Sequence, residues 1–182
     1  AESLSLSGKP LFMDTPTNEL IIKNLSITRN RYMDYPMVPD RVIWYGRRLG
    51  YAGDFRQAIK IFTEGILDFP EDPKFYRHRG HRYITIREFD RAINDLEKAS
   101  ALIIGKANSI EEDGAPNAAG IPVSTLHGNI FYHLGLSYYL IQDWENAKRV
   151  YDLDHSVARN DDNRVSIAHW RYMIRRRMGV TH

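Results

Sequence analysis

A dense run of cationic and imidazole side chains lies near the middle of the chain, at Arg77-His78-Arg79-Gly80-His81-Arg82-Tyr83. With a helical period, Lys74, Arg77, His78 and His81 share one face of a helix. Two kinds of chemistry suit such a face. Arginine and lysine bind carboxylates and phosphates, whereas histidines ligate metal ions.

The metal hypothesis is the weaker of these two. His78 and His81 are three residues apart, and His133 occupies the equivalent place in a later segment of similar pattern. The neighbouring arginines would repel a cation, however, and no carboxylate lies on the same face. The HExxH spacing of zinc enzymes is also absent. The sequence therefore predicts no metal site and no bound cofactor.

Composition and missing motifs argue against catalysis. The 182 residues include no cysteine, which excludes a disulfide framework, a thiolate zinc site and a cysteine nucleophile. No glycine-rich phosphate loop and no GxSxG motif is present. The acidic run Glu111-Glu112-Asp113 has the pattern of a solvated loop. We therefore expect a non-catalytic protein.

Charge is nearly balanced over the whole chain but unevenly distributed. The 25 Lys and Arg residues against 23 Asp and Glu residues leave a net charge of +2, and no acid follows Asp162. The late cluster Arg175-Arg176-Arg177 suits a helix C-terminus. Nucleic acid is an unlikely partner, because acids are interspersed through the body of the chain. With 43% hydrophobic residues and no long apolar run, the sequence predicts a globular chain without a membrane-spanning helix.

Three segments share one pattern of small and aromatic residues. In each, a glycine precedes an aromatic residue by nine positions and an alanine by twelve, and the first two segments are 34 residues apart. The residues concerned are Gly46, Phe55 and Ala58, then Gly80, Phe89 and Ala92, and then Gly135, Trp144 and Ala147. A fixed period of this length is typical of helical repeat proteins.

The pattern resembles the tetratricopeptide repeat (TPR), and bacterial exported proteins that carry such repeats are the nearest likeness. The resemblance implies an all-α, right-handed superhelical solenoid of three TPR-like helix-turn-helix repeats with a terminal capping helix. The glycines would allow close approach of the two helices of each repeat, opposite a small face supplied by the alanines. Mid-helix glycine is otherwise unfavourable by about 1 kcal/mol, so a packing role is the natural compensation.

The pattern divides the chain into an N-terminal part, 1–38, and a TPR-like domain, 39–182. The first part contains an extended arm and a half-repeat helix at about 17–33. In the second, the expected repeats and capping helix are 39–72, 73–104, 125–161 and 162–178, with an insertion at 105–124. The expected repeat helices are 40–52, 54–69, 73–86, 88–103, 125–141 and 143–158. In the capping helix, the apolar spacing of Val165, Ala168, Tyr172 and Met173 predicts the packing face.

In TPR proteins, the first helix of each repeat lines a concave groove. The resemblance therefore implies a groove that is both aromatic and cationic. Its predicted partner-binding residues are Trp44, Arg47, Tyr51, Lys74, Arg77, His78, His81, Asn129, Tyr132, His133, Tyr139 and Trp170. Arginine and aromatic residues are frequent anchors at interfaces, so we expect a protein or peptide partner with acidic character. The alternative is a small molecule or anion in the groove, ordered by the insertion at 105–124.

Some members of the family hold a terminal carboxylate with lysines and asparagines at set groove positions. The equivalent positions here are Ile43, Arg47, His78, Asn129 and His133, and only Asn129 keeps the expected side chain. The resemblance therefore argues against that specific activity and for a different mode of binding.

Two cellular locations follow from two interpretations of the start of the chain. The chain begins with Ala1, and residues 3–8 have the composition of an extended arm. If a secretion signal has been removed before Ala1, the protein is periplasmic or secreted. Otherwise it is cytoplasmic.

Overall fold

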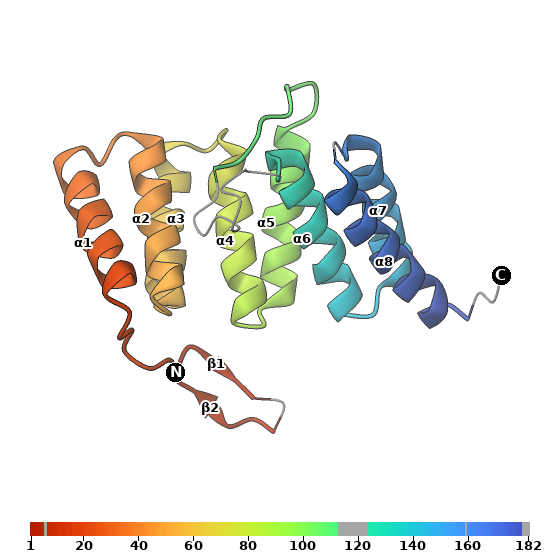
Figure 1. The fold of residues 1–182 in the computed structure, drawn as a ribbon, viewed down its shortest axis with the longest axis horizontal. Helices are drawn as coiled ribbons and strands as arrows, with labels where there is room; N and C mark the ends of the chain where they lie inside the picture. The colour runs from red at the N-terminus through yellow and green to blue at the C-terminus, as the bar shows by residue number, and fades with distance from the viewer. Residues whose placement is uncertain (6, 113–123, 159, 180–182) are drawn as a thin grey trace. The chain divides into compact units, whose positions relative to one another are not determined.

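A computed structural model describes residues 1–5, 7–112, 124–158 and 160–179, and these residues form helices and one small strand pair (Figure 1). The helices are α1 (Glu19–Asp34), α2 (Pro39–Tyr51), α3 (Phe55–Asp68), α4 (Pro73–Thr85), α5 (Phe89–Leu102), α6 (Leu126–Leu140), α7 (Trp144–Val157) and α8 (Asp161–Arg177). The antiparallel strands are β1 (Ser3–Leu4) and β2 (Pro10–Leu11). Within the described ranges, no helix has both the length and the apolar character needed to cross a membrane.

Local sequence signals set the helix ends. The side chain of Asp54 accepts a hydrogen bond from the Gln57 amide at 3.2 Å, which caps α3. Asp143 caps α7 in the same way, and Pro73 supplies a favourable first residue for α4. The helices begin and end within two residues of the expected ranges, so the all-α repeat prediction is confirmed.

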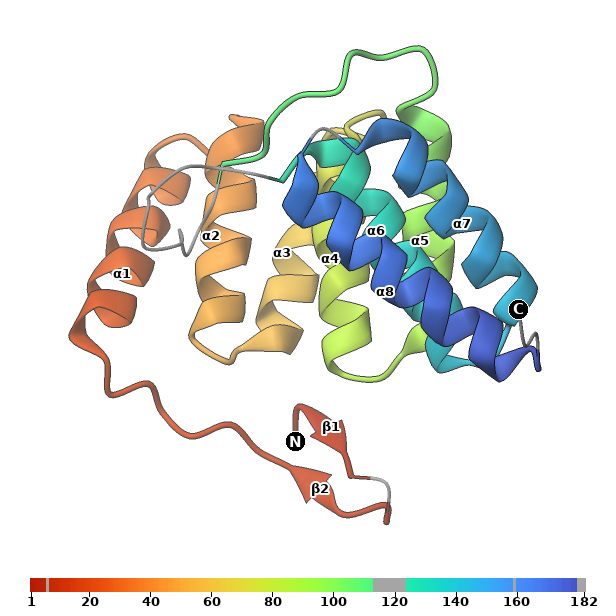
Figure 2. The same ribbon diagram turned by 45° about the vertical axis from the view of Figure 1, so that its right-hand side comes forward.

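The chain forms two compact units, Ala1–Asp95 and Leu96–His182. In the first unit, α1 packs on α2, α2 on α3 and α3 on α4 (Figures 1 and 2). In the second, α6 packs on α7, and α8 contacts both. The division expected at residue 38 rests on the repeat pattern alone and stays a prediction.

An aromatic ring of the second helix lies over the glycine of the first helix in two of the repeats. A Cβ atom on Gly46 would lie 2.5 Å from Cε1 of Phe62, and one on Gly135 would lie 2.7 Å from Cε2 of Tyr151. Ala58 is fully buried, as predicted for the small face. The residue that fills the space above each glycine, however, is the ring four positions after the alanine.

The packing face predicted for α8 is wrong. Val165 and Tyr172 are 69% and 56% exposed, whereas Ile167 and Ile174 are buried. Trp170 lies between these isoleucines on the same face and packs against the core of the second unit. The predicted set of apolar residues and the observed set both have a helical period. Packing against the neighbouring helices buries the set that contains the isoleucines and the tryptophan.

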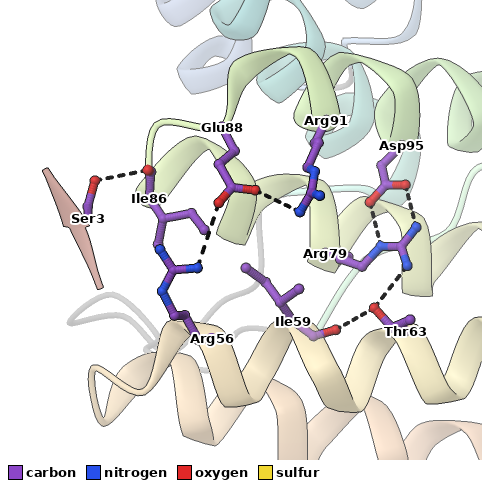
Figure 3. A network of polar contacts seen from close by, with 9 residues as sticks. All are labelled: Ser3, Arg56, Ile59, Thr63, Arg79, Ile86, Glu88, Arg91 and Asp95. Carbon is purple, nitrogen blue, oxygen red and sulfur yellow. Dashed lines mark hydrogen bonds and ion pairs between the residues drawn. The ribbon is translucent and has the colours of Figure 1, made fainter. Parts of the chain in front are cut away.

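The N-terminal arm is a hairpin anchored to the first unit, rather than the extended segment that we expected. A carboxylate oxygen of Glu2 accepts a hydrogen bond from the Arg56 amide at 3.1 Å, at the start of α3. The hydroxyl of Ser3 donates to the Ile86 carbonyl at 2.9 Å, in the turn after α4 (Figure 3). The arm therefore touches the ends of two different helices.

The turn inside each repeat requires one residue with left-handed backbone geometry. Gly53 has φ 86°, and the equivalent residues Arg87 and Gln142 have φ 65° and 66°. Glycine adopts this geometry without steric cost, whereas other residues are strained by roughly 1–2 kcal/mol. Only the first repeat places glycine at this position.

Replacing Arg87 or Gln142 with glycine should therefore stabilise the protein. We expect each variant to raise the free energy of unfolding by about 0.5–1 kcal/mol, because the strain is relieved. Urea unfolding measures this change. Ala52→Gly is the control, since Ala52 has φ −82° and gains only chain entropy in the unfolded state. A loss of stability in both test variants would contradict this account of the turn.

Candidate functional site

Three arginines come together on α2 and α4 in the first unit, and we call Arg47, Arg77 and Arg82 the arginine cluster. The guanidinium carbon of Arg47 lies 4.1 Å from the centre of the Trp44 ring, a cation–π distance. An Nη atom of Arg47 also donates to the hydroxyl of Tyr51 at 3.5 Å. Trp44, Arg47 and Tyr51, which the sequence placed in the groove, thus form one continuous set on α2.

Arg77 and His78 are more buried than the groove prediction implied. They are only 8% and 4% exposed, and Nη1 of Arg77 lies 2.8 Å from Nδ1 of His78. Arginine has no acceptor, so it donates and Nδ1 accepts, which leaves His78 neutral in this arrangement. The His78 ring stacks on Phe62 at 5.6 Å. Neither side chain therefore has the exposure that a groove-lining residue needs, and their role in binding stays a prediction.

Arg82 is the member of the cluster that the sequence analysis missed. Burial lowers its pKa to about 10, and the nearby charges of Arg77 and Arg47 add to this effect. A Cβ atom on Gly50 would lie 2.6 Å from Nη1 of Arg82, so the guanidinium lies directly over that glycine. No carboxylate among the described residues forms an ion pair with Arg82.

A signal for Arg82 was present in the repeat. Arg48 and Arg82 each follow the repeat glycine by two positions. The guanidinium carbon of Arg48 also lies near an aromatic ring, 5.1 Å from the centre of Trp44. Comparing this position across the repeats would have drawn attention to it.

The other two predicted residues of α4 are Lys74 and His81. Lys74 forms an ion pair with Asp40 at 3.1 Å, and both side chains are substantially exposed. Such a pair contributes little to stability, at most about 1 kcal/mol. His81 is half-buried on the same helix. Lys74 is therefore partly neutralised from within the chain, unlike Arg82.

Arg79, in the same cationic run, has a structural role. Its guanidinium donates to both carboxylate oxygens of Asp95 at 2.7 Å and to the hydroxyl of Thr63 at 3.0 Å (Figure 3). Burial alone would lower the pKa of Arg79, but the hydrogen bonds and charge of Asp95 raise it. This bidentate pair joins α3, α4 and the first part of α5.

In the second unit, the predicted aromatic groove residues pack against one another. Tyr139 and Trp170 lie 5.2 Å apart between ring centres, and Tyr132 and Trp170 lie 6.4 Å apart, both edge to face. Tyr151 stacks on the other face of this group, 5.8 Å from Trp170. All three predicted residues are partly buried and pack against the core of the unit. Their use by a partner stays a prediction.

A pocket of about 260 Å³ lies beside this aromatic group, between α6, α7 and α8. Asn129, Tyr132 and His133 line it on α6, and Asp154 lines it on α7. Asp154 is only 5% exposed, and burial raises its pKa to about 7. The sequence analysis did not single out Asp154, because an isolated acid on a helix has no distinguishing spacing.

No metal cluster is found beside these sites in the described ranges, and the insertion contributes one contact, because a carboxylate oxygen of Glu111 accepts a hydrogen bond from the side-chain amide of Asn129. Within the described residues, no three His, Asp or Glu side chains are grouped so that they could hold a metal ion. Residues 113–123 of the insertion lie outside the described parts of the chain, so its predicted ordering of a small-molecule or anion site stays a prediction. At its base, the Glu111 amide donates to the Ser124 carbonyl at 3.0 Å.

Comparison with known proteins places this fold among TPR structures. No family model matches the sequence. A crystal structure of MamA protein has a TM-score of 0.65 at 15% identity, covering 87% of this chain and 74% of that chain. The first TPR of Spaghetti (RPAP3), bound to the HSP90 peptide SRMEEVD, has a TM-score of 0.58 at 15% identity, covering 87% of this chain and 98% of that chain. The fold is TPR-like, as the resemblance predicted.

Breaking the buried Arg79–Asp95 pair from one side should be costly. We expect Asp95→Asn to lower the free energy of unfolding by about 3 kcal/mol, because Arg79 is left buried without its counter-charge. The double variant Arg79→Met, Asp95→Leu should lose less than Asp95→Asn alone. Chemical denaturation measures both. An equal loss of unfolding free energy in the single and the double variant would mean that packing, rather than charge, determines the contribution of this pair.

Asp154 should make stability depend on pH in an identifiable way. Its pKa rises from 3.8 in the unfolded chain to about 7 in the folded one, so folding favours the protonated acid. Stability is therefore lost as the pH rises through this window. We expect Asp154→Asn to be more stable than the parent by about 4 kcal/mol at pH 8, with the difference disappearing near pH 4. Denaturation at both pH values tests this prediction. The same stability difference between variant and parent at pH 4 and pH 8 would contradict it.

Proposed function

We propose that this protein is a non-catalytic scaffold that binds an acidic segment of another protein through the arginine cluster of its first unit. The observation that carries the proposal is Arg82. It is a half-buried cation beside two other arginines, and no carboxylate of the described residues pairs with it. Arg79, on the same helix, shows the opposite arrangement, with its carboxylate in place.

A partner carboxylate would correct the charge imbalance at Arg82. Like charges and burial both oppose ionisation of this guanidinium, and a bound carboxylate would offset both effects. Arginine also binds carboxylates in a bidentate geometry that lysine cannot match. Trp44 and Tyr51, beside Arg47, offer aromatic surface for the apolar parts of the same segment.

One of the structural neighbours supports a peptide as the partner. The TPR of Spaghetti (RPAP3) is bound to the peptide SRMEEVD, which is rich in acidic residues. The positions that hold a terminal carboxylate in some TPR proteins differ here, with Ile43 buried and His78 neutral. We therefore propose recognition of acidic side chains rather than of a free chain end.

Loss of two arginines should weaken binding without unfolding the protein. We expect Arg47→Gln, Arg82→Gln to reduce the affinity for fluorescein-labelled SRMEEVD at least tenfold, because each charge-assisted hydrogen bond contributes about 1.5–3 kcal/mol. Fluorescence anisotropy measures the affinity. Arg77 is left intact, since its burial against His78 makes it part of the fold.

The control for this experiment removes the same charge elsewhere. Arg175→Gln, Arg176→Gln changes two exposed arginines at the end of α8 and should bind like the parent. The neutral peptide SRMQQVN should bind weakly to every variant. The proposal fails if the acidic and neutral peptides bind the parent equally, or if the Arg47, Arg82 variant keeps full affinity while remaining folded by circular dichroism.

A further inference from the structure

The pocket of the second unit contains a buried acid that has no partner. Asp154 is 5% exposed, and among the described residues no side chain or backbone group forms a hydrogen bond or ion pair with its carboxylate. Gly128 of α6 lies close to this carboxylate, because a Cβ atom there would be 3.7 Å from Oδ1. Both residues line the same pocket.

An unpaired buried carboxylate is unfavourable and needs a compensating interaction. Elsewhere on α7, Asp152 shows the usual solution, since it pairs with Lys148 at 2.8 Å and with Arg171 at 3.1 Å. Asp154, only two residues further along, has no such cation. The cost of keeping it in the core suggests that its charge serves a ligand.

Most of the remaining described residues of the pocket wall are polar, and they include the imidazole of His133. Ser166 and Asn163 of α8 line it, and their side chains make no hydrogen bond within the described parts of the chain. Tyr132 of α6 adds an aromatic ring. Among the described residues that line the pocket, there is no lysine or arginine. A buried carboxylate beside hydrogen-bonding groups and one aromatic ring, with the Glu111 carboxylate nearby on Asn129, suits a small organic cation.

We propose that this pocket binds an ammonium group, carried by a small amine or by a lysine side chain, with Asp154 as its counter-ion. A volume of about 260 Å³ accommodates a primary amine with a short chain. The ammonium would donate to the carboxylate, and neighbouring polar groups such as Ser166 would take its remaining hydrogen bonds. This site is separate from the arginine cluster, which lies in the other unit and carries the opposite charge.

Binding should depend on the ionisation of Asp154. Its pKa of about 7 means that the carboxylate is largely neutral at pH 5.5 and largely charged at pH 8. The titratable groups around it are Tyr132 and His133 on α6, Tyr151 on α7 and Glu111, which accepts a hydrogen bond from Asn129. Helix α8 contributes the neutral Asn163 and Ser166. An ammonium ligand should therefore bind more tightly at the higher pH.

The experiment titrates the protein with n-butylammonium chloride, Nα-acetyl-lysine N-methylamide and 1-butanol, followed by two-dimensional NMR of the backbone amides. At pH 8 we expect saturable shifts on α6, α7 and α8 with the ammonium probes and none with 1-butanol. Affinity should fall at least tenfold at pH 5.5. Binding of both ammonium probes, or of either one alone, supports the site. Comparing the affinities of the two ammonium probes shows whether a free amine or a lysine side chain fits the pocket.

Variants locate the binding. Asp154→Asn should lose at least tenfold in affinity, whereas the matched control Asp152→Asn, on the same helix, should bind like the parent. Ser166→Leu fills the pocket from α8 with the carboxylate intact and should also prevent binding, which keeps the test decisive if Asp154→Asn folds poorly. Equal affinity of the parent and Asp154→Asn, equal shifts with 1-butanol, or no saturable binding of either ammonium probe would overturn the proposal.

Discussion

The contact between a glycine on one helix and an aromatic ring on the next determines how close the two helices of a repeat can be. With Phe62 over Gly46 and Tyr151 over Gly135, any side chain at the glycine would collide with the ring. Each hairpin therefore has one permitted spacing, and the residues around the contact follow from it. His78 stacks on the same Phe62, and Trp170 stacks on the same Tyr151. Both candidate sites are thus built beside these rings.

The two candidate sites each contain a buried charged group that lacks the counter-charge found elsewhere in the fold. Arg79 is compensated by Asp95, and the pair links three helices. Arg82 and Asp154 have no such compensation within the described residues, and the burial of each shifts its pKa toward the neutral form. Because a protein core normally excludes unpaired charge, these two departures are the strongest functional signals in the structure.

The repeat pattern was sufficient to predict the helices, because glycine, aromatic and alanine positions recur at fixed offsets. It was insufficient for the face of α8, where Val165 and Tyr172 have the same period as Ile167 and Ile174. Burial is also set by neighbours in space, so Arg77 looked exposed in the sequence and is covered in the fold. Asp154 has no signal at all in the sequence, since its lack of a partner depends on three helices at once.

The base of the 105–124 segment has a consequence for how this fold can change over time. The Glu111 amide donates to the Ser124 carbonyl, and the Leu126 amide donates to the Ser109 carbonyl, so residues 109–111 are joined to residues 124–126 at the start of α6. Once the ends of a loop are held together, added length has only a small entropic cost. Sequence can therefore be inserted or removed here without disturbing the register of the helices. The fold has, between two of its repeats, a place where a new binding element could be acquired.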